Sequence, residues 1–268
     1  MKLRAKQIAM ANLPSQPEDF ARALRSRFSI SGVVDLHPLA AEIGLKIREV
    51  EVEGFEGALV RRANRPQGVV AVKKDIRENG RKRFCIAHEM GHYLLPGHGT
   101  KESICLKEDI ESFRQGIPKQ EEAANRFAVE LLLPSSEIAP IVRKESATIA
   151  VAKIIGEHYQ TSLTAASLKC IELTRNEVCA VVLSAGGIIR WCRLNDQFTE
   201  YVRIGQRLSG DSLASDLSKE MREKDGSVPA TAWINKYGLP ADAKIWEDSI
   251  FLPYYNSVLT IITIMQPL

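Results

Sequence analysis

The sequence has no paired cysteines, no long apolar run and no strong charge of either sign. Its five cysteines are odd in number and none stands in a CxxC pair, which argues for reduced thiols and against a disulfide framework. No stretch approaches about 18 apolar residues, and no apolar segment follows the basic N-terminus, so we expect neither a membrane span nor a secretory signal. The net charge of +3 is too small to indicate a polyanion partner. We therefore expect a cytoplasmic protein.

Histidine is also scarce, yet two of the five histidines stand four positions apart in His88-Glu89-Met90-Gly91-His92. On a helix these two imidazoles lie about 40° apart, because each residue turns about 100°. Both can therefore reach one ion, and the Glu beside the first His can act as general base on a water that the metal activates. The pattern predicts a zinc site with hydrolytic chemistry.

Residues 81–95 fit the helix that this site needs. The segment contains no Pro, and its apolar residues recur at spacings of three and four. Pro96-Gly97 predicts its end. Gly91 costs roughly 1 kcal/mol of helix propensity relative to Ala, and a residue this small between two ligands would let another backbone approach.

A second helix is expected at residues 121–134. It has an acidic first turn, a stripe that includes Ala124 and Ala128, and a Pro at its end. Small residues in a stripe permit close packing against another helix. Glu121 and Glu122 are explained equally well as ordinary acidic residues at a helix N-terminus or as a source of a metal ligand.

The third metal ligand has two candidates. His98 stands where HExxHxxGxxH metalloproteases place their third histidine, but their turn-forming Gly is replaced here by Leu95. Glu121 would complete a His-His-Glu set, which is a known catalytic zinc arrangement. Glu122 points about 100° away from Glu121, and Asn125, one turn on, could hydrogen-bond a ligand.

The two motifs together resemble the ImmA/IrrE family of zinc metallo-endopeptidases. The resemblance rests on residues 84–95 and on the order Glu121-x-x-Ala-Asn-Arg-Phe-Ala-x-Glu-Leu-Leu-Leu-Pro134, and it covers roughly residues 30–140 well. It implies that His88, His92 and Glu121 hold zinc and that Glu89 is the catalytic base. It also implies a repressor-type transcription regulator as protein substrate, in a stress response or in mobile-element control.

The resemblance leaves the oxyanion-stabilising residue open among Tyr93, His98 and Arg126. Cys85, on the metal helix, and Cys105, in the adjoining loop, are either regulatory thiols or buried, inert cysteines. The presence of Glu89 argues against the rival interpretation, a non-catalytic DNA- or protein-binding transcription regulator with a structural or vestigial metal site.

The predicted fold class is α+β, in three parts. Residues 1–140 form a zincin-like peptidase domain, whose small antiparallel sheet is expected at residues 45–52, 55–62 and 68–73. Residues 141–176 form a helix-turn-helix-like segment. Residues 177–268 read as mixed α/β and resemble the GAF-like part of the longer family members, which could sense a ligand or serve as a homodimer platform.

The helix-turn-helix-like segment makes DNA binding by this chain doubtful. Its second helix offers only Lys169 and then Arg175, without the side chains that meet base edges. A helical hairpin that packs on the peptidase domain is an equally good interpretation. In the C-terminal part we expect a hairpin across Ala185-Gly186-Gly187, a helix at residues 213–224 and a final strand at residues 258–265.

Overall fold

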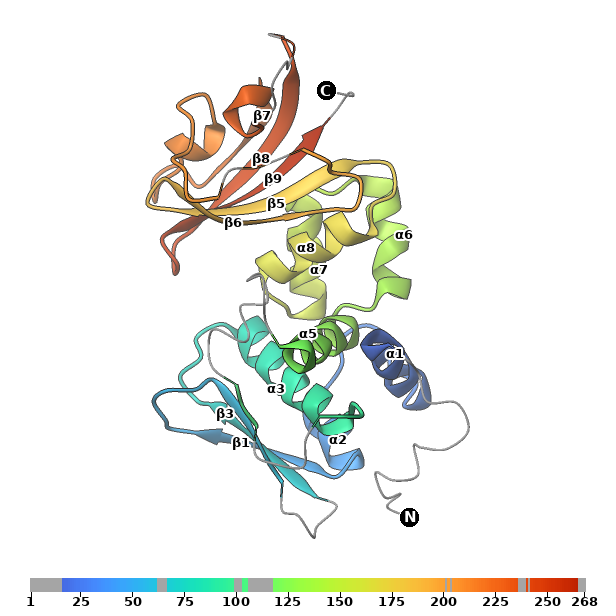
Figure 1. The fold of residues 1–268 in the computed structure, drawn as a ribbon. Helices are drawn as coiled ribbons and strands as arrows, with labels where there is room; N and C mark the ends of the chain where they lie inside the picture. The colour runs from blue at the N-terminus through green and yellow to red at the C-terminus, as the bar shows by residue number, and fades with distance from the viewer. Residues whose placement is uncertain are drawn as a thin grey trace. The chain divides into compact units, whose positions relative to one another are not determined.

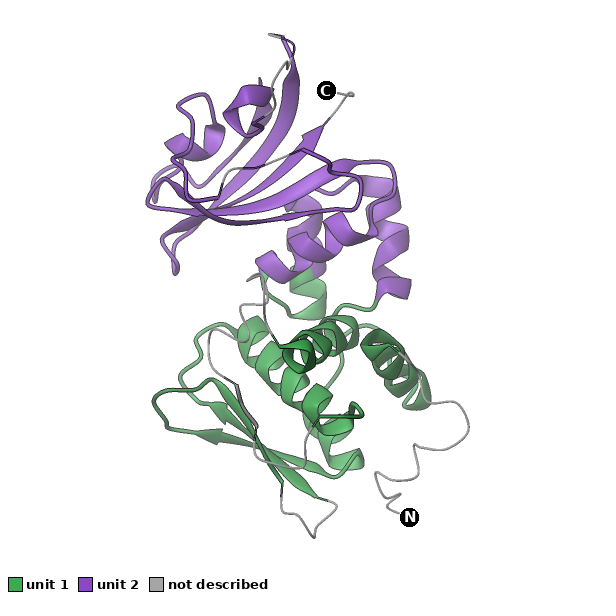
Figure 2. Ribbon diagram, in the orientation of Figure 1, with its two compact units in different colours: residues 1–134, 156–162 green, residues 135–155, 163–268 purple. Residues whose placement is uncertain are grey.

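The computed structural model describes residues 16–61, 67–98, 103–105, 118–200, 202, 204–235, 240 and 242–264, with the backbone alone for 103–105. The chain divides into two compact units, coloured separately in Figure 2. Unit 1 comprises residues 1–134 and 156–162, and unit 2 comprises residues 135–155 and 163–268. No described helix is both long and apolar enough to cross a membrane.

Unit 1 combines a four-stranded sheet with helices, and the two central helices, α3 and α5, lie side by side (Figure 1). The predicted helices and the first three strands are confirmed within a few residues at each end. The elements in chain order are α1 (Pro17–Arg27), α2 (Leu36–Glu42), β1 (Leu45–Val50), β2 (Gly57–Arg61), β3 (Gly68–Lys73), α3 (Asn79–Leu94), β4 (Ser103–Cys105) and α5 (Lys119–Leu132).

The sheet of unit 1 is mixed, so the prediction of an antiparallel sheet was wrong. Its order is β1-β3-β2-β4, and β1 runs parallel to β3 while the other pairs are antiparallel. The reason is that β2 and β3 form a hairpin and β1 pairs with the far edge of β3. A strand, β4, also lies where only a loop was expected, and it pairs with β2 from Gly57 to Leu59.

Helix α3 is the centre of the core of unit 1. Every residue from Cys85 to His92 is buried, because one side of the helix faces the sheet and the other faces α5. Met90 and Ile86 pack in one cluster with Val70 of β3 and Phe127 of α5. The helix ends at Leu94, before Pro96, as its sequence predicts.

Unit 2 is built on a five-stranded sheet with the order β6-β5-β9-β8-β7, in which every neighbouring pair is antiparallel. The C-terminal part is therefore α+β and not mixed α/β. Its elements are α6 (Ser135–Glu145), α7 (Ile149–Tyr159, which runs into unit 1), α8 (Leu163–Leu173), β5 (Val178–Ala185), β6 (Ile188–Leu194), η2 (Leu213–Asp216), β7 (Glu223–Pro229), η3 (Ala230–Ala232), β8 (Lys244–Leu252) and β9 (Ser257–Ile264).

Two C-terminal predictions are confirmed and one is wrong. The β5–β6 hairpin turns at Gly186 and Gly187, whose φ angles of 60° and 70° suit glycine. The final strand is β9. The helix predicted at residues 213–224 is absent, because only the short 3-10 turn η2 forms and the chain then enters the edge strand β7, which pairs with β8.

The two predicted helices of the helix-turn-helix-like segment are present as α7 and α8. The turn between them lies against the start of α3, since a Cβ on Gly80 would be 2.4 Å from the Ser162 nitrogen. In α8, Lys169 is 2% exposed and its Nζ donates to Glu172, 2.9 Å away. Glu172 is the one exposed residue of that helix. Lys169 is therefore not available to contact a base.

A buried carboxylate on β8 accepts several hydrogen bonds from the segments around η2 and η3 in unit 2. Glu247 of β8 is fully buried, and it lies where η2 approaches the strand and within hydrogen-bond distance of Trp233, the residue that follows η3. It accepts hydrogen bonds from three side chains and two backbone nitrogens: Ser212 Oγ (3.0 Å), Ser249 Oγ (3.0 Å), Trp233 Nε1 (2.7 Å), Leu213 N (3.1 Å) and Ala214 N (2.6 Å).

We predict that Glu247→Gln lowers the free energy of unfolding of unit 2 by about 2–3 kcal/mol, because an amide nitrogen would face donors that need an acceptor. Urea unfolding followed by tryptophan fluorescence measures this, since Trp191, Trp233 and Trp246 all lie in unit 2. The control is Asp211→Asn, at the exposed residue just before Ser212, which should change the free energy of unfolding by less than about 0.5 kcal/mol. An unchanged Glu247→Gln protein would refute the structural role.

Candidate metal centre

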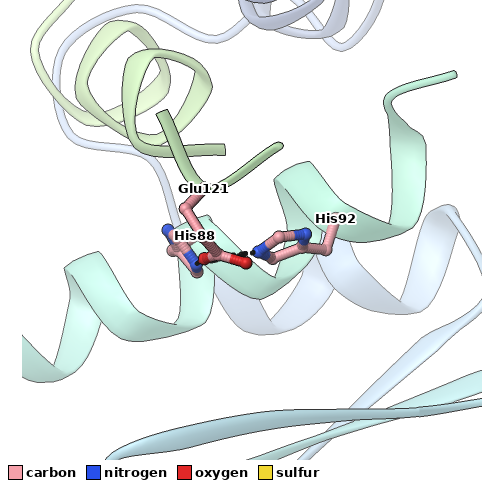
Figure 3. Close-up of side chains that lie close together, drawn as sticks. All are labelled: His88, His92 and Glu121. Carbon is pink, nitrogen blue, oxygen red and sulfur yellow. Dashed lines mark hydrogen bonds and ion pairs between the residues drawn. The ribbon is translucent and has the colours of Figure 1, made fainter. Parts of the chain in front are cut away.

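Three side chains from two helices converge on one point in unit 1 (Figure 3). His88 and His92 come from α3, and Glu121 comes from the first turn of α5. Glu121 Oε2 lies 3.1 Å from Nε2 of each imidazole, and the two Nε2 atoms are 2.9 Å apart. Among the described residues, no other group of three potential metal ligands gathers in this way.

The close approach of α3 and α5 creates this convergence, and Gly91 permits it. A Cβ on Gly91 would lie 3.2 Å from the Ala124 Cα, 3.3 Å from the Ala124 oxygen and 3.1 Å from Phe127 Cδ1. The prediction that Gly91 lets another backbone approach is thus confirmed. Because α5 can lie this close, its first turn reaches the two histidines one helical turn apart on α3.

The Nδ1 atoms of both imidazoles, which face away from the convergence point, also have hydrogen-bond partners. His88 Nδ1 lies 2.8 Å from Asn125 Oδ1, and His92 Nδ1 lies 2.9 Å from His98 Nδ1. Since an amide oxygen only accepts, His88 donates from Nδ1 to Asn125, which turns its Nε2 toward Glu121 and His92. Such outer partners fix the tautomer and orientation of metal-binding histidines.

The carboxylate and the two imidazoles at the centre need a shared positive charge. Although burial by itself raises the pKa of Glu121, hydrogen bonds with His88 and His92 hold that pKa well below its usual range. A carboxylate and two imidazole Nε2 atoms at 2.9–3.1 Å would repel one another unless a proton or a cation lies between them. Two histidines and one glutamate are a donor set of catalytic zinc sites, which as a class keep a fourth position open. The residues therefore fit a zinc ion.

Glu89 lies outside this convergent group, as a general base must. It is fully buried and follows His88 directly in the sequence, and its Oε1 would be 3.1 Å from a Cβ placed on Gly57 of β2. Its carboxyl group is therefore on the sheet side of α3, whereas Glu121 approaches from α5. The assignment of His88, His92 and Glu121 as ligands and of Glu89 as base remains a prediction.

The other candidates named from the sequence have different surroundings. His98 contacts the far nitrogen of His92, and burial, with nearby His92, lowers its pKa to about 4, so it is neutral at pH 7. Arg126 donates to Glu18 of α1 at 2.6 and 2.9 Å, which directs it away from the convergent group and argues against an oxyanion role.

Sequence reasoning missed Arg61, which supports the end of the metal helix. Its Nη2 donates to the His92 carbonyl oxygen at 2.7 Å, and its guanidinium lies 4.5 Å from the centre of the Tyr93 ring. Tyr93, an oxyanion candidate, is thus stacked against this cation. No sequence signal marks Arg61, because its partner on α3 is a backbone atom.

The two cysteines near the site differ in how much of them is described. Cys85 is fully buried, and this burial strongly raises the pKa of its thiol. A buried thiol with a raised pKa is a poor nucleophile, which favours an inert cysteine. The backbone of Cys105 lies in β4, but its side chain is outside the described residues, so its suggested redox role stays a prediction.

Residues 40–170 match the peptidase family model described as "IrrE N-terminal-like domain". This part of the chain belongs to the ImmA/IrrE family. The predicted resemblance is confirmed, and the family is one of metallopeptidases, in keeping with a His-His-Glu group that can hold a metal ion.

Among solved structures, the chain is similar to one described as a "Mycobacterium tuberculosis transcriptional regulator". The TM-score is 0.59 at 12% sequence identity, and the match covers 92% of this chain and 75% of that one. At this identity the similarity concerns the fold alone. No curated protein matches the sequence.

We predict that Glu121→Ala removes most of the zinc affinity. His98→Ala should leave zinc bound and lower the zinc affinity by only about 10–100-fold. The reason is that Glu121 reaches the convergence point and His98 touches only the far side of His92. Chelator competition on purified protein measures both. Tight binding by Glu121→Ala together with loss of zinc in His98→Ala would assign the third ligand to His98.

Proposed function

We propose that the chain is a zinc-dependent endopeptidase that cleaves a repressor-type transcription regulator in a stress or mobile-element response. The observation that carries the proposal is the convergence of His88, His92 and Glu121 beside a buried Glu89, in a domain of a metallopeptidase family. A site that only stabilised the fold would have no use for a carboxylate next to the first ligand.

Zinc bound by this donor set would polarise the scissile carbonyl and lower the pKa of a coordinated water toward about 7. Glu89 would accept a proton on its carboxylate and pass it to the leaving amine. Asn125 and His98 keep the two imidazoles turned toward the centre through their Nδ1 atoms. The surrounding buried residues of α3 exclude bulk water, which strengthens each of these electrostatic contacts.

An extended peptide has a suitable strand beside this base. Gly57, which lies next to Glu89, pairs with Cys105 of β4, the last strand in the sheet order. In the described part of the chain, β4 has β2 as its strand partner on one side, so its other edge can accept a peptide by strand addition. The substrate would then run along β4, near the metal helix.

A transcription regulator whose metal site has lost its catalytic use is the second candidate, because the fold is similar to a protein described as a transcriptional regulator. The surroundings of α8 weigh against DNA recognition. Its lysine is buried, its exposed residue is Glu172, and the preceding turn lies against Gly80. The five-stranded antiparallel sheet of unit 2 supports a GAF-like regulatory region, whose ligand or dimer role is part of the proposal.

Catalysis is tested with Glu89→Gln. We expect this protein to bind zinc like the native chain and to lose cleavage of repressors encoded beside its gene by about 10²–10⁴-fold, because the amide cannot accept the proton. Metal analysis and a timed cleavage assay measure the two properties. A zinc-free Glu89→Gln protein would make Glu89 a ligand, and a fully active one would end its role as base.

DNA binding separates the two candidates. With a net charge of +3 and no exposed basic residue on α8, we expect no sequence-specific complex at nanomolar protein. Fluorescence anisotropy with labelled DNA from the gene's own promoter region, at two salt concentrations, measures this. A tight, salt-sensitive, sequence-specific complex would favour the regulator.

A further inference from the structure

Gly57 is a glycine whose backbone does not require one. It is the first residue of β2, where it pairs with Val72 of β3 and Cys105 of β4. Its φ angle is outside the left-handed region, unlike that of Gly54 in the preceding turn, which has a φ of 93°. Glycine inside a strand weakens it and often marks the close approach of another group. The reason for this glycine must therefore lie in its surroundings.

The group that approaches Gly57 is the Glu89 side chain. A Cβ at position 57 would lie 3.1 Å from Glu89 Oε1 and 3.4 Å from Glu89 Cγ. The next contact, Cys85 Cβ at 3.6 Å, is ordinary van der Waals contact. Since Glu89 is fully buried, its side chain has packed neighbours around it and cannot give way into solvent. The space left by the missing Cβ is thus part of the space that holds Glu89.

We propose that Gly57 is a positioning residue for Glu89. The strand without a side chain at this point sets how far the carboxyl group lies from α3 and on which side of the helix it rests. A base must stay within about 2.6–3.2 Å of the proton that it takes, and a displacement of about 1 Å can cost about 100-fold in rate. This inference rests on the proposed function for its catalytic meaning, but the contact itself does not.

The stability of the zinc-free protein gives a test that is independent of activity. At a compatible backbone position, Gly→Ala ordinarily stabilises a protein, because it restricts the unfolded chain. If Glu89 occupies the space, Gly57→Ala should instead destabilise unit 1, and removing the Glu89 side chain should restore the ordinary sign. The two positions should therefore show a coupling in a double-mutant cycle.

The thiol of Cys85 can report the unfolding of unit 1. All three tryptophans lie in unit 2, so their fluorescence does not report unit 1, whereas Cys85 is fully buried beside Gly57 and Glu89. The measurement is the urea concentration at which a thiol reagent modifies half of Cys85, read by peptide mass spectrometry on the full chain without metal. This midpoint is compared with and without the Gly57→Ala substitution, in chains that carry Glu, Gln or Ala at position 89.

We expect Gly57→Ala to lower the midpoint when position 89 is Glu or Gln, since the two side chains have the same size, and to leave it unchanged or raise it when position 89 is Ala. The matched control is Gly68→Ala in β3, whose Cβ would lie 2.8 Å from Leu45 Cδ2 and does not approach Glu89. It should lower the midpoint equally in all three backgrounds. If Gly57→Ala does not fold, recovery of folded protein by Glu89→Ala takes the place of the midpoint.

A shift that is the same in all three backgrounds, a raised midpoint in the native background, or no recovery by Glu89→Ala would overturn the proposal. Cleavage adds a second measurement on zinc-loaded protein. Gly57→Ala should bind zinc as tightly as the native chain and lose roughly tenfold in kcat with little change in KM. If the native chain cleaves no repressor, the proposed function fails, while the Cys85 midpoints still decide the role of Gly57.

Discussion

The close packing of α3 against α5 at Gly91 is the contact on which the candidate site depends. A Cβ at position 91 would lie only 3.2 Å from the Ala124 Cα, so one helix would have to give way by a few tenths of an ångström. That displacement would also move Glu121, because it lies in the first turn of the same helix. The cost of a glycine inside a helix, roughly 1 kcal/mol, is therefore offset by a geometry that brings two histidines and a carboxylate within 3.1 Å.

Much of unit 1 could be predicted from the sequence because its signals are local. The apolar spacing and the proline of residues 81–96 define α3, and the HExxH order fixes which side chains share a face. The pairing of β1 with β3 could not be predicted, since it joins strands that the β2–β3 hairpin separates along the chain. Strand β4 was missed because three residues carry no period.

The helix expected at residues 213–224 fails for a reason that lies far away in sequence. The first turn does form, but its backbone nitrogens at Leu213 and Ala214 donate to Glu247 on β8, and the chain then becomes the partner of that same strand. A local pattern of apolar residues says nothing of an acceptor more than thirty positions later. Tertiary hydrogen bonding replaced local propensity here.

Three glycines near the site stand in helices or strands, where local propensity disfavours glycine. Each faces a different neighbour. Gly91 faces the α5 backbone, Gly80 faces the α7–α8 turn, and Gly57 faces Glu89. Together they let three structures approach one helix more closely than any side chain would allow. The side chains of a functional site are held in place by the elements that pack around them, so the geometry at α3 depends on these close contacts. The positions of the Glu121 and Glu89 side chains are thus set by the absence of side chains as much as by their presence.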